Sequence, residues 1–64
     1  MKYDSIEIIQ MIEGDGFIFQ MIAVIPKGNN KVQRVTIGKQ YSARNVASRA
    51  AHKLSKNVSH WYLI

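Results

Sequence analysis

The chain has no cysteine among its 64 residues, and it has no acidic residue after residue 15. The absence of cysteine excludes disulfides and thiolate metal sites, and it fits a reducing cytoplasm, where we expect the protein to be. A chain of this length forms a single domain, residues 1–64, which buries only about 60% of the surface that its unfolded form exposes. Oligomerisation is then the remaining common way to reinforce so small a domain.

Long apolar runs are also missing. The apolar region from residue 6 to residue 25 is interrupted by polar side chains, namely Glu7, Gln10, Glu13, Asp15 and Gln20. Such a segment cannot cross a bilayer as a helix. Acids follow the first methionine at once, without the apolar stretch of a signal peptide. We therefore expect a soluble, cytoplasmic protein without a membrane partner.

The charges that are present are strongly segregated. The net charge is +5, and all four acids lie in the first fifteen residues, whereas all nine lysines and arginines except Lys2 lie between residues 16 and 64. An average surface mixes both signs over such a length. The pattern favours a basic surface for an acidic partner. The alternative is a solvated basic face that only aids solubility.

Three segments have the composition of strands, at about residues 5–12, 17–25 and 31–37. Glycines between the first two segments and a Pro-Lys-Gly-Asn-Asn sequence between the second and third predict tight turns. Strands joined by short turns pair antiparallel. The sequence therefore predicts a three-stranded antiparallel sheet.

The segment at about residues 43–56 has the pattern of a helix. Ser42 is a suitable helix cap, and Tyr41 and Val46 flank it at the spacing of a hydrophobic staple. Asn57 is a plausible left-handed end of the helix. The apolar positions that follow recur at helical spacing and form a narrow stripe, which consists of Val46, Ala47, Ala50, Ala51 and Leu54.

The expected fold class is α+β, with the helix packed on one face of the sheet. Residues 58–64 form either a short fourth strand or a tail packed on the core. Strand alternation directs Phe17, Phe19, Met21, Val35 and Ile37 toward the helix. It leaves Ile18, Ile22 and Val24 on the opposite face, which is too apolar to stay in water. We expect either a homodimer, formed by packing of sheets through these residues or by pairing of edge strands, or residues 58–64 folded back over this face.

The residues that catalysis requires are not grouped in the sequence. His52 and His60 are the only histidines, and no cysteine or nearby acid accompanies them. Gly14 and Gly16 lack the further glycine and the helix of a phosphate-binding loop. We expect a protein that is not an enzyme and has no cofactor and no bound metal.

The basic residues instead suggest binding. They lie on the predicted helix, in its flanking loops and on the third strand: Lys31, Arg34, Lys39, Arg44, Arg49, Lys53 and Lys56. Such a set can neutralise several phosphates and release their counterions. We expect a small non-enzymatic module that binds nucleic acid, DNA or RNA, through the helix and its flanking loops. The alternative is a protein-protein interaction module, such as a small phage-type inhibitor or adaptor, that docks on an acidic protein surface.

Short motifs resemble known nucleic-acid-binding modules. Ser42-Ala43-Arg44 and Ala50-Ala51 resemble the second half of the double-stranded RNA-binding domain. Val35-Thr36-Ile37-Gly38, followed by an alanine-rich helix, resembles the DNA-binding domains of ethylene-response factors and of phage integrase amino-terminal arms. These resemblances imply duplex binding, in the second case through Arg34, Thr36 and Gln20 on the sheet. Small phage-encoded inhibitors of host defence systems are also similar in size.

Overall fold

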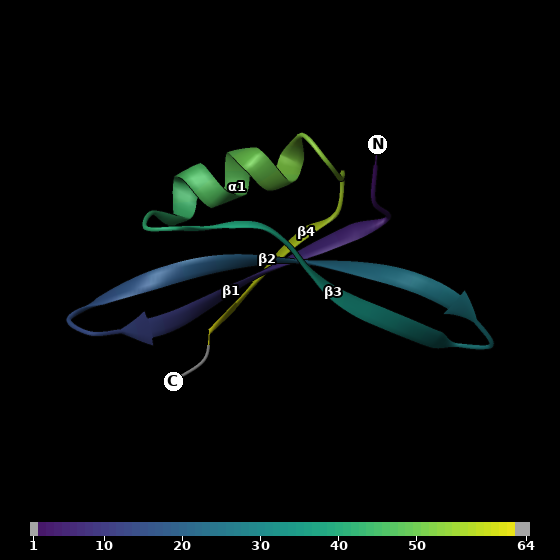
Figure 1. Ribbon diagram of the computed structural model, residues 1–64. Coiled ribbons are helices and arrows are strands. Elements are labelled where there is room, and N and C mark those ends of the chain that lie inside the picture. The colour runs from purple at the N-terminus through teal and green to yellow at the C-terminus, as the bar shows by residue number, and fades with distance from the viewer. Residues whose placement is uncertain (1, 63–64) are drawn as a thin grey trace.

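The computed structural model describes residues 2–62, which form a four-stranded sheet with one helix on one face (Figure 1). The elements are β1 (Ser5–Glu13), β2 (Gly16–Gly28), β3 (Lys31–Tyr41), α1 (Arg44–His52) and β4 (Val58–Tyr62). The strand order is β3-β2-β1-β4, in which β1, β2 and β3 pair antiparallel and β4 runs parallel to β1. The predicted α+β class is confirmed, and residues 58–62 form the fourth strand. Residues 63 and 64 of that predicted strand lie outside the described residues.

Both hairpins turn within two residues. Glu13 pairs with Gly16, and Gly14 between them has a φ of 59°. In the second hairpin Asn29 and Asn30 have φ values of 51° and 63°, the signs of a type I′ turn, which matches the twist of the flanking strands. Pairing therefore continues up to each turn, so β2 is longer than the predicted 17–25. β3 starts at residue 31 as predicted, but it continues past residue 37 to Tyr41.

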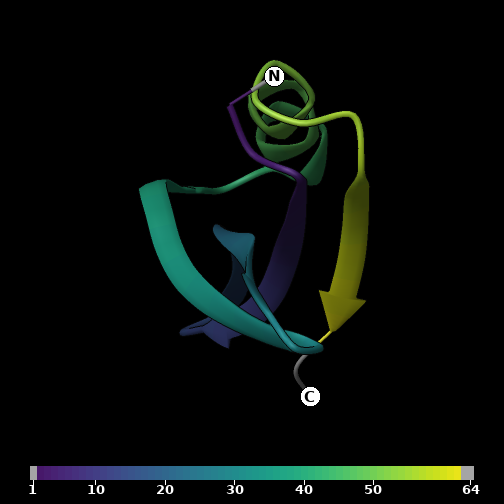
Figure 2. The ribbon, with the colours of Figure 1, turned by 90° about the vertical axis from the view of Figure 1, so that its right-hand side faces the viewer.

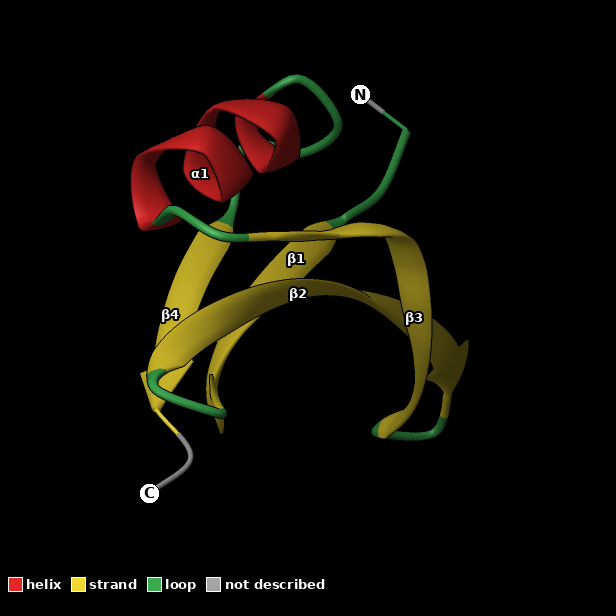
Figure 3. Cartoon of the chain, turned by 60° about the vertical axis from the view of Figure 1, so that its left-hand side comes forward, coloured by secondary structure: helices red, strands yellow, loops and turns green. Residues whose placement is uncertain are grey.

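A bulge in β3 bends the sheet. Phe19 pairs with Tyr41 and Met21 pairs with Ile37, so extra residues of β3 lie opposite this part of β2. Gly38 takes up the irregular geometry with a φ of 69°. Gln20 is only 8% exposed, and its side-chain nitrogen donates to the carbonyl of Ile37 at 3.1 Å. Bulges increase local bending and twist, and the sheet curves away from the helix (Figure 3).

The helix starts without the predicted cap. Ala43 occupies the N-cap position and no side chain caps the helix, so the prediction of Ser42 as cap is wrong. The predicted staple is wrong as well, because Tyr41 packs against the core whereas Val46 is 42% exposed and does not belong to the core cluster. The start of α1 is held instead by tertiary contacts of the chain on either side of it.

The helix ends at His52, earlier than the predicted residue 56. The amides of Leu54 and Ser55 both donate to the carbonyl of Ala51 and close the last turn. The Ser55 hydroxyl is fully buried, donates to the carbonyl of Asp4 at 3.1 Å and accepts the amide of Asn57 at 3.1 Å. Asn57 is not left-handed, because only Asn29 and Asn30 have positive φ among the described non-glycine residues. A bond to the N-terminal segment, which sequence spacing does not reveal, ends the helix.

The core lies between α1 and the centre of the sheet, where Ile6, Ile8, Phe19 and Met21 meet Ala47 and Ala51. The alanines allow the helix to lie close to the sheet (Figure 2). Phe17 faces the same side but is 52% exposed, and Val35 is also exposed, so placing these two side chains under the helix is wrong. The reason is length: nine helical residues span about 14 Å, whereas the molecule is 41 Å long.

The buried Ser55 hydroxyl gives a first prediction. We expect Ser55→Ala to lower the free energy of unfolding by about 1–3 kcal/mol, because the Asn57 amide loses its acceptor beside a buried site. Ser42→Ala is the matched control, since Ser42 is exposed and provides no cap, and it should change stability by less than about 0.5 kcal/mol. Urea denaturation followed by circular dichroism measures both. Equal losses would contradict the role given to Ser55.

Candidate binding surface

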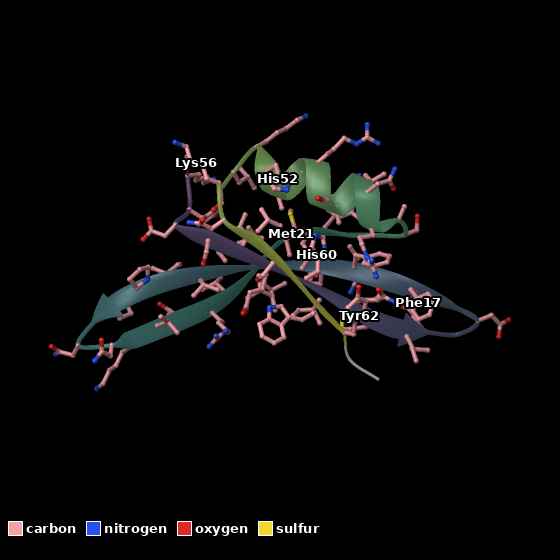
Figure 4. The ribbon with its side chains drawn as sticks, turned by 180° about the vertical axis from the view of Figure 1, so that it is seen from behind. Phe17, Met21, His52, Lys56, His60 and Tyr62 are labelled. Atoms are coloured by element: carbon pink, nitrogen blue, oxygen red, sulfur yellow. The ribbon has the colours of Figure 1, made fainter. Side chains whose placement is uncertain are left out.

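The exposed side of α1 carries cationic and neutral polar groups beside one exposed apolar residue, Val46. Arg49, His52 and Lys53 are exposed on the side away from Ala47 and Ala51, and the helix contains no acidic residue. Residues three and four positions apart are neighbours on a helix, so Arg49, His52 and Lys53 form one group. Figure 4 shows His52 on the helix and His60 below it on β4. Arg49 and His52 lie within α1 and Lys53 caps its C-terminal end, so helical spacing indicates that the three are neighbours.

Arg44 begins the helix and is held by two strands. Its Nη2 donates to Oε1 of Gln10 at 2.6 Å, and its Cζ lies 4.9 Å from the centre of the Tyr62 ring. Both contacts orient the guanidinium without neutralising it. The exposed Tyr62 lies on β4, an edge strand of the sheet (Figure 4). Sequence reasoning missed this role of Gln10 and Tyr62, and no local signal indicates it, because they come from β1 and β4.

Two further predicted cations lie next to the ends of the helix in the chain. Lys39 lies near the end of β3 that leads into α1, and its Nζ is 5.5 Å from the centre of the Tyr41 ring. Lys56 is exposed in the segment after α1, where it lines a shallow surface hollow with Tyr3 and Asp4. These two lysines extend the basic surface beyond the helix itself.

The structure separates the other two predicted cations from the helix. Arg34 lies on the sheet face opposite α1, where its Nε donates to Oε1 of Glu7 at 3.0 Å, and this is the only ion pair within residues 2–62. Lys31 follows the β2–β3 turn, at the end of the sheet far from α1 (Figure 1). We define the helix-side basic surface as the remaining set: Lys39, Arg44, Arg49, Lys53 and Lys56, with His52.

The face opposite the helix is apolar, as the sequence predicted. Strand register places Ile18, Ile22 and Val24 there, half-buried. Trp61 of β4 pairs with Ile9 on the same face and is 54% exposed. The idea that residues 58–64 fold back over this face is wrong for 58–62, because β4 lies beside β1 as the edge strand. Among these residues, Trp61 and Ser59 face that side.

The described residues do not assemble a metal centre. Within residues 2–62 no three histidine or acidic side chains come close enough together to hold a metal ion. In the same part of the chain, no helix has the length and hydropathy to span a membrane. The arrangement that remains is a basic helix side and an apolar sheet face on opposite sides of one thin molecule.

Comparisons with protein-family models, with curated proteins and with solved structures gave no match to this chain. The resemblances based on the serine-led, alanine-rich helix therefore stay predictions.

Proposed function

We propose that the protein is a small non-enzymatic module that binds nucleic acid through its helix-side basic surface. The observation that supports this proposal is the exposed side of α1, where Arg49, His52 and Lys53 stand without a single acid on the helix. A helix that is charged only for solubility usually carries glutamate as well as lysine. Unneutralised cations grouped on one side suit a polyanion, because each neutralised phosphate releases counterions.

The length of the helix fits a short run of phosphates. Nine helical residues span about 14 Å, and one strand of a duplex presents a phosphate about every 3.4 Å along its axis. Along the duplex axis, this span corresponds to about four phosphates of one strand. Lys39 and Lys56 reach beyond it in the flanking segments and widen the contact.

Arg44 is the cation of the surface that two side chains hold in place. Gln10 and Tyr62 fix its guanidinium, so less side-chain freedom is lost when it contacts a phosphate. Arg34 is the contrasting case, since Glu7 already neutralises it on the other side of the sheet. This difference supports the helix side, rather than the sheet, as the nucleic-acid-binding face.

The test compares two variants that each remove two positive charges. We expect Arg49/Lys53→Ala to bind random-sequence duplex DNA and RNA about tenfold more weakly, since each exposed charge contact is worth up to about 1 kcal/mol. The slope of log affinity against log salt should fall by about two. Lys27/Lys31→Ala, at the far β2–β3 turn, should keep most of the affinity. Fluorescence anisotropy across a salt series measures all three proteins.

The affinity of the wild-type protein for nucleic acid should also fall as the salt concentration rises in this series. Four neutralised phosphates predict an affinity loss of about 100-fold between about 50 and 200 mM salt. Binding that does not respond to salt, or equal losses in both variants, would contradict the proposal. The absence of any nucleic-acid binding would also overturn it and would favour the alternative, an acidic protein surface as the partner.

A further inference from the structure

The sheet face opposite α1 presents an apolar surface that the fold itself covers only in part. Strand register places the following side chains on it: Ile9, Met11, Ile18, Ile22, Val24 and Trp61. None of them belongs to the core cluster between the sheet and the helix. We call this set the open face. Contiguous apolar surface of this kind marks an interaction site in small proteins.

Several polar groups on the open face already have partners within the chain. Arg34 pairs with Glu7, so the pair adds no net charge. The side-chain amide of Gln20, in the middle of β2, donates to the carbonyl of Ile37. Within residues 2–62, the cation on this face thus has an acidic partner, unlike the cations on the helix side. The apolar side chains around the pair suit an apolar occupant.

The open face is also hollow. The sheet bends away from the helix, so the open face is the inner side of an arch (Figure 3). Closed barrels of eight strands have interiors that side chains just fill. Two arches of four strands that face one another would enclose a comparable interior, lined by the apolar side chains of both copies.

The exposed area supports a partner for this face. The chain exposes 4615 Å², whereas a monomer of 7.3 kDa is expected to expose about 4,200 Å². The exposed area is above the expected value because the molecule is elongated, 41 Å in its longest dimension, and has a small core. A second copy that covers the open face removes from water the apolar area that the single chain leaves accessible there.

The charges at the two ends of the sheet fit a second copy in one orientation. The β1–β2 turn carries Glu13 and Asp15, and the β2–β3 turn at the opposite end carries Lys27 and Lys31 (Figure 1). A two-fold axis across the long direction of the sheet brings the acidic turn of each copy to the basic turn of the other. A contact of this kind is self-complementary, as an isologous dimer requires.

From these observations we infer that the protein forms a homodimer in which two open faces enclose a shared apolar core, with the acidic turn of each copy against the basic turn of the other. The inference does not depend on nucleic-acid binding. Both helices lie on the outside of this dimer, and both basic surfaces stay exposed.

The test is sedimentation equilibrium without nucleic acid at micromolar to millimolar concentration. The wild-type protein should sediment at twice 7.3 kDa. Ile22→Glu places a charge in the open face and should give a monomer. Val46→Glu makes the same kind of change at an exposed apolar residue on the helix and should stay dimeric. A wild-type monomer throughout, or a dimer that tolerates Ile22→Glu, would overturn the inference.

Two further variants separate dimer loss from misfolding. Trp61→Ala removes a side chain that is outside the core, so it should weaken the dimer while the far-ultraviolet circular dichroism stays unchanged. Glu13→Lys/Asp15→Lys should also weaken the dimer through repulsion from Lys27 and Lys31 of the other copy. Adding Lys27→Glu/Lys31→Glu to the same chain should restore it. Failure of this rescue would contradict the proposed orientation.

Discussion

Ile8→Ala is expected to destabilise the protein by about 2–5 kcal/mol. Ile8 is only 1% exposed at the centre of the core, where it pairs with Met21 on β2 and with His60 on β4. Domains of this size have a total stability of about 3–10 kcal/mol, so the variant should be largely unfolded or close to its midpoint without denaturant. The loss has two parts, the lost burial of the side chain and the cavity that remains under α1.

The control for this prediction is Ile12→Ala. Ile12 lies on the same strand and faces the same side of the sheet, but it lies in the exposed part of β1 near the turn. We expect it to change stability by less than about 1 kcal/mol, because little burial is lost. Urea titrations followed by circular dichroism, at one fixed protein concentration, compare the two variants. Equal losses would show that the core is not centred beneath the helix.

Gly38→Ala is expected to lower the free energy of unfolding by about 2–3 kcal/mol, from two separate causes. The φ of 69° at Gly38 is unfavourable for a residue with a side chain, and this contributes about 1–2 kcal/mol. A β-carbon at Gly38 would also lie 2.8 Å from the terminal methyl group of Met21, which is buried and has to repack. The variant therefore strains the bulge and disturbs the core together.

Gly28→Ala isolates the backbone part of this effect. Gly28 has a φ of 80°, but a β-carbon there would meet nothing within 4 Å. Gly28→Ala should therefore lower the free energy of unfolding by the backbone contribution alone, about 1–2 kcal/mol. Thermal denaturation of both variants gives the difference, which measures the contact with Met21. A Gly28→Ala variant that is less stable than Gly38→Ala would contradict this account.

Much of the fold was predictable because its signals are local. Glycine and asparagine in the two-residue turns predict the hairpins, since these residues tolerate positive φ. Alternation along β2 correctly separated Met21, under the helix, from Ile22, on the open face. The alanines of α1 predicted the buried side of the helix. Each of these predictions needs only residues that are close in sequence.

The errors arose where contacts between distant residues decide the outcome. Helical spacing continues to residue 56, but the buried Ser55 hydroxyl binds the Asp4 carbonyl and the helix ends at His52. Phe17 has the correct parity for the core, yet the helix is too short to cover it. Sequence patterns predict which face of the sheet a side chain lies on, but not whether the helix on that face is long enough to cover it.

The candidate binding surface, too, was predictable only in part from the sequence. The sequence by itself determined that the cations are unmatched by acids after residue 15, and that several of them share one side of a helix. Only the tertiary structure decided which of these charges stay free: Glu7 neutralises Arg34, whereas Gln10 and Tyr62 orient Arg44 and leave its charge. The physical reason is that charge and periodicity are properties of neighbouring residues, whereas neutralisation and burial depend on which distant strands the fold brings together.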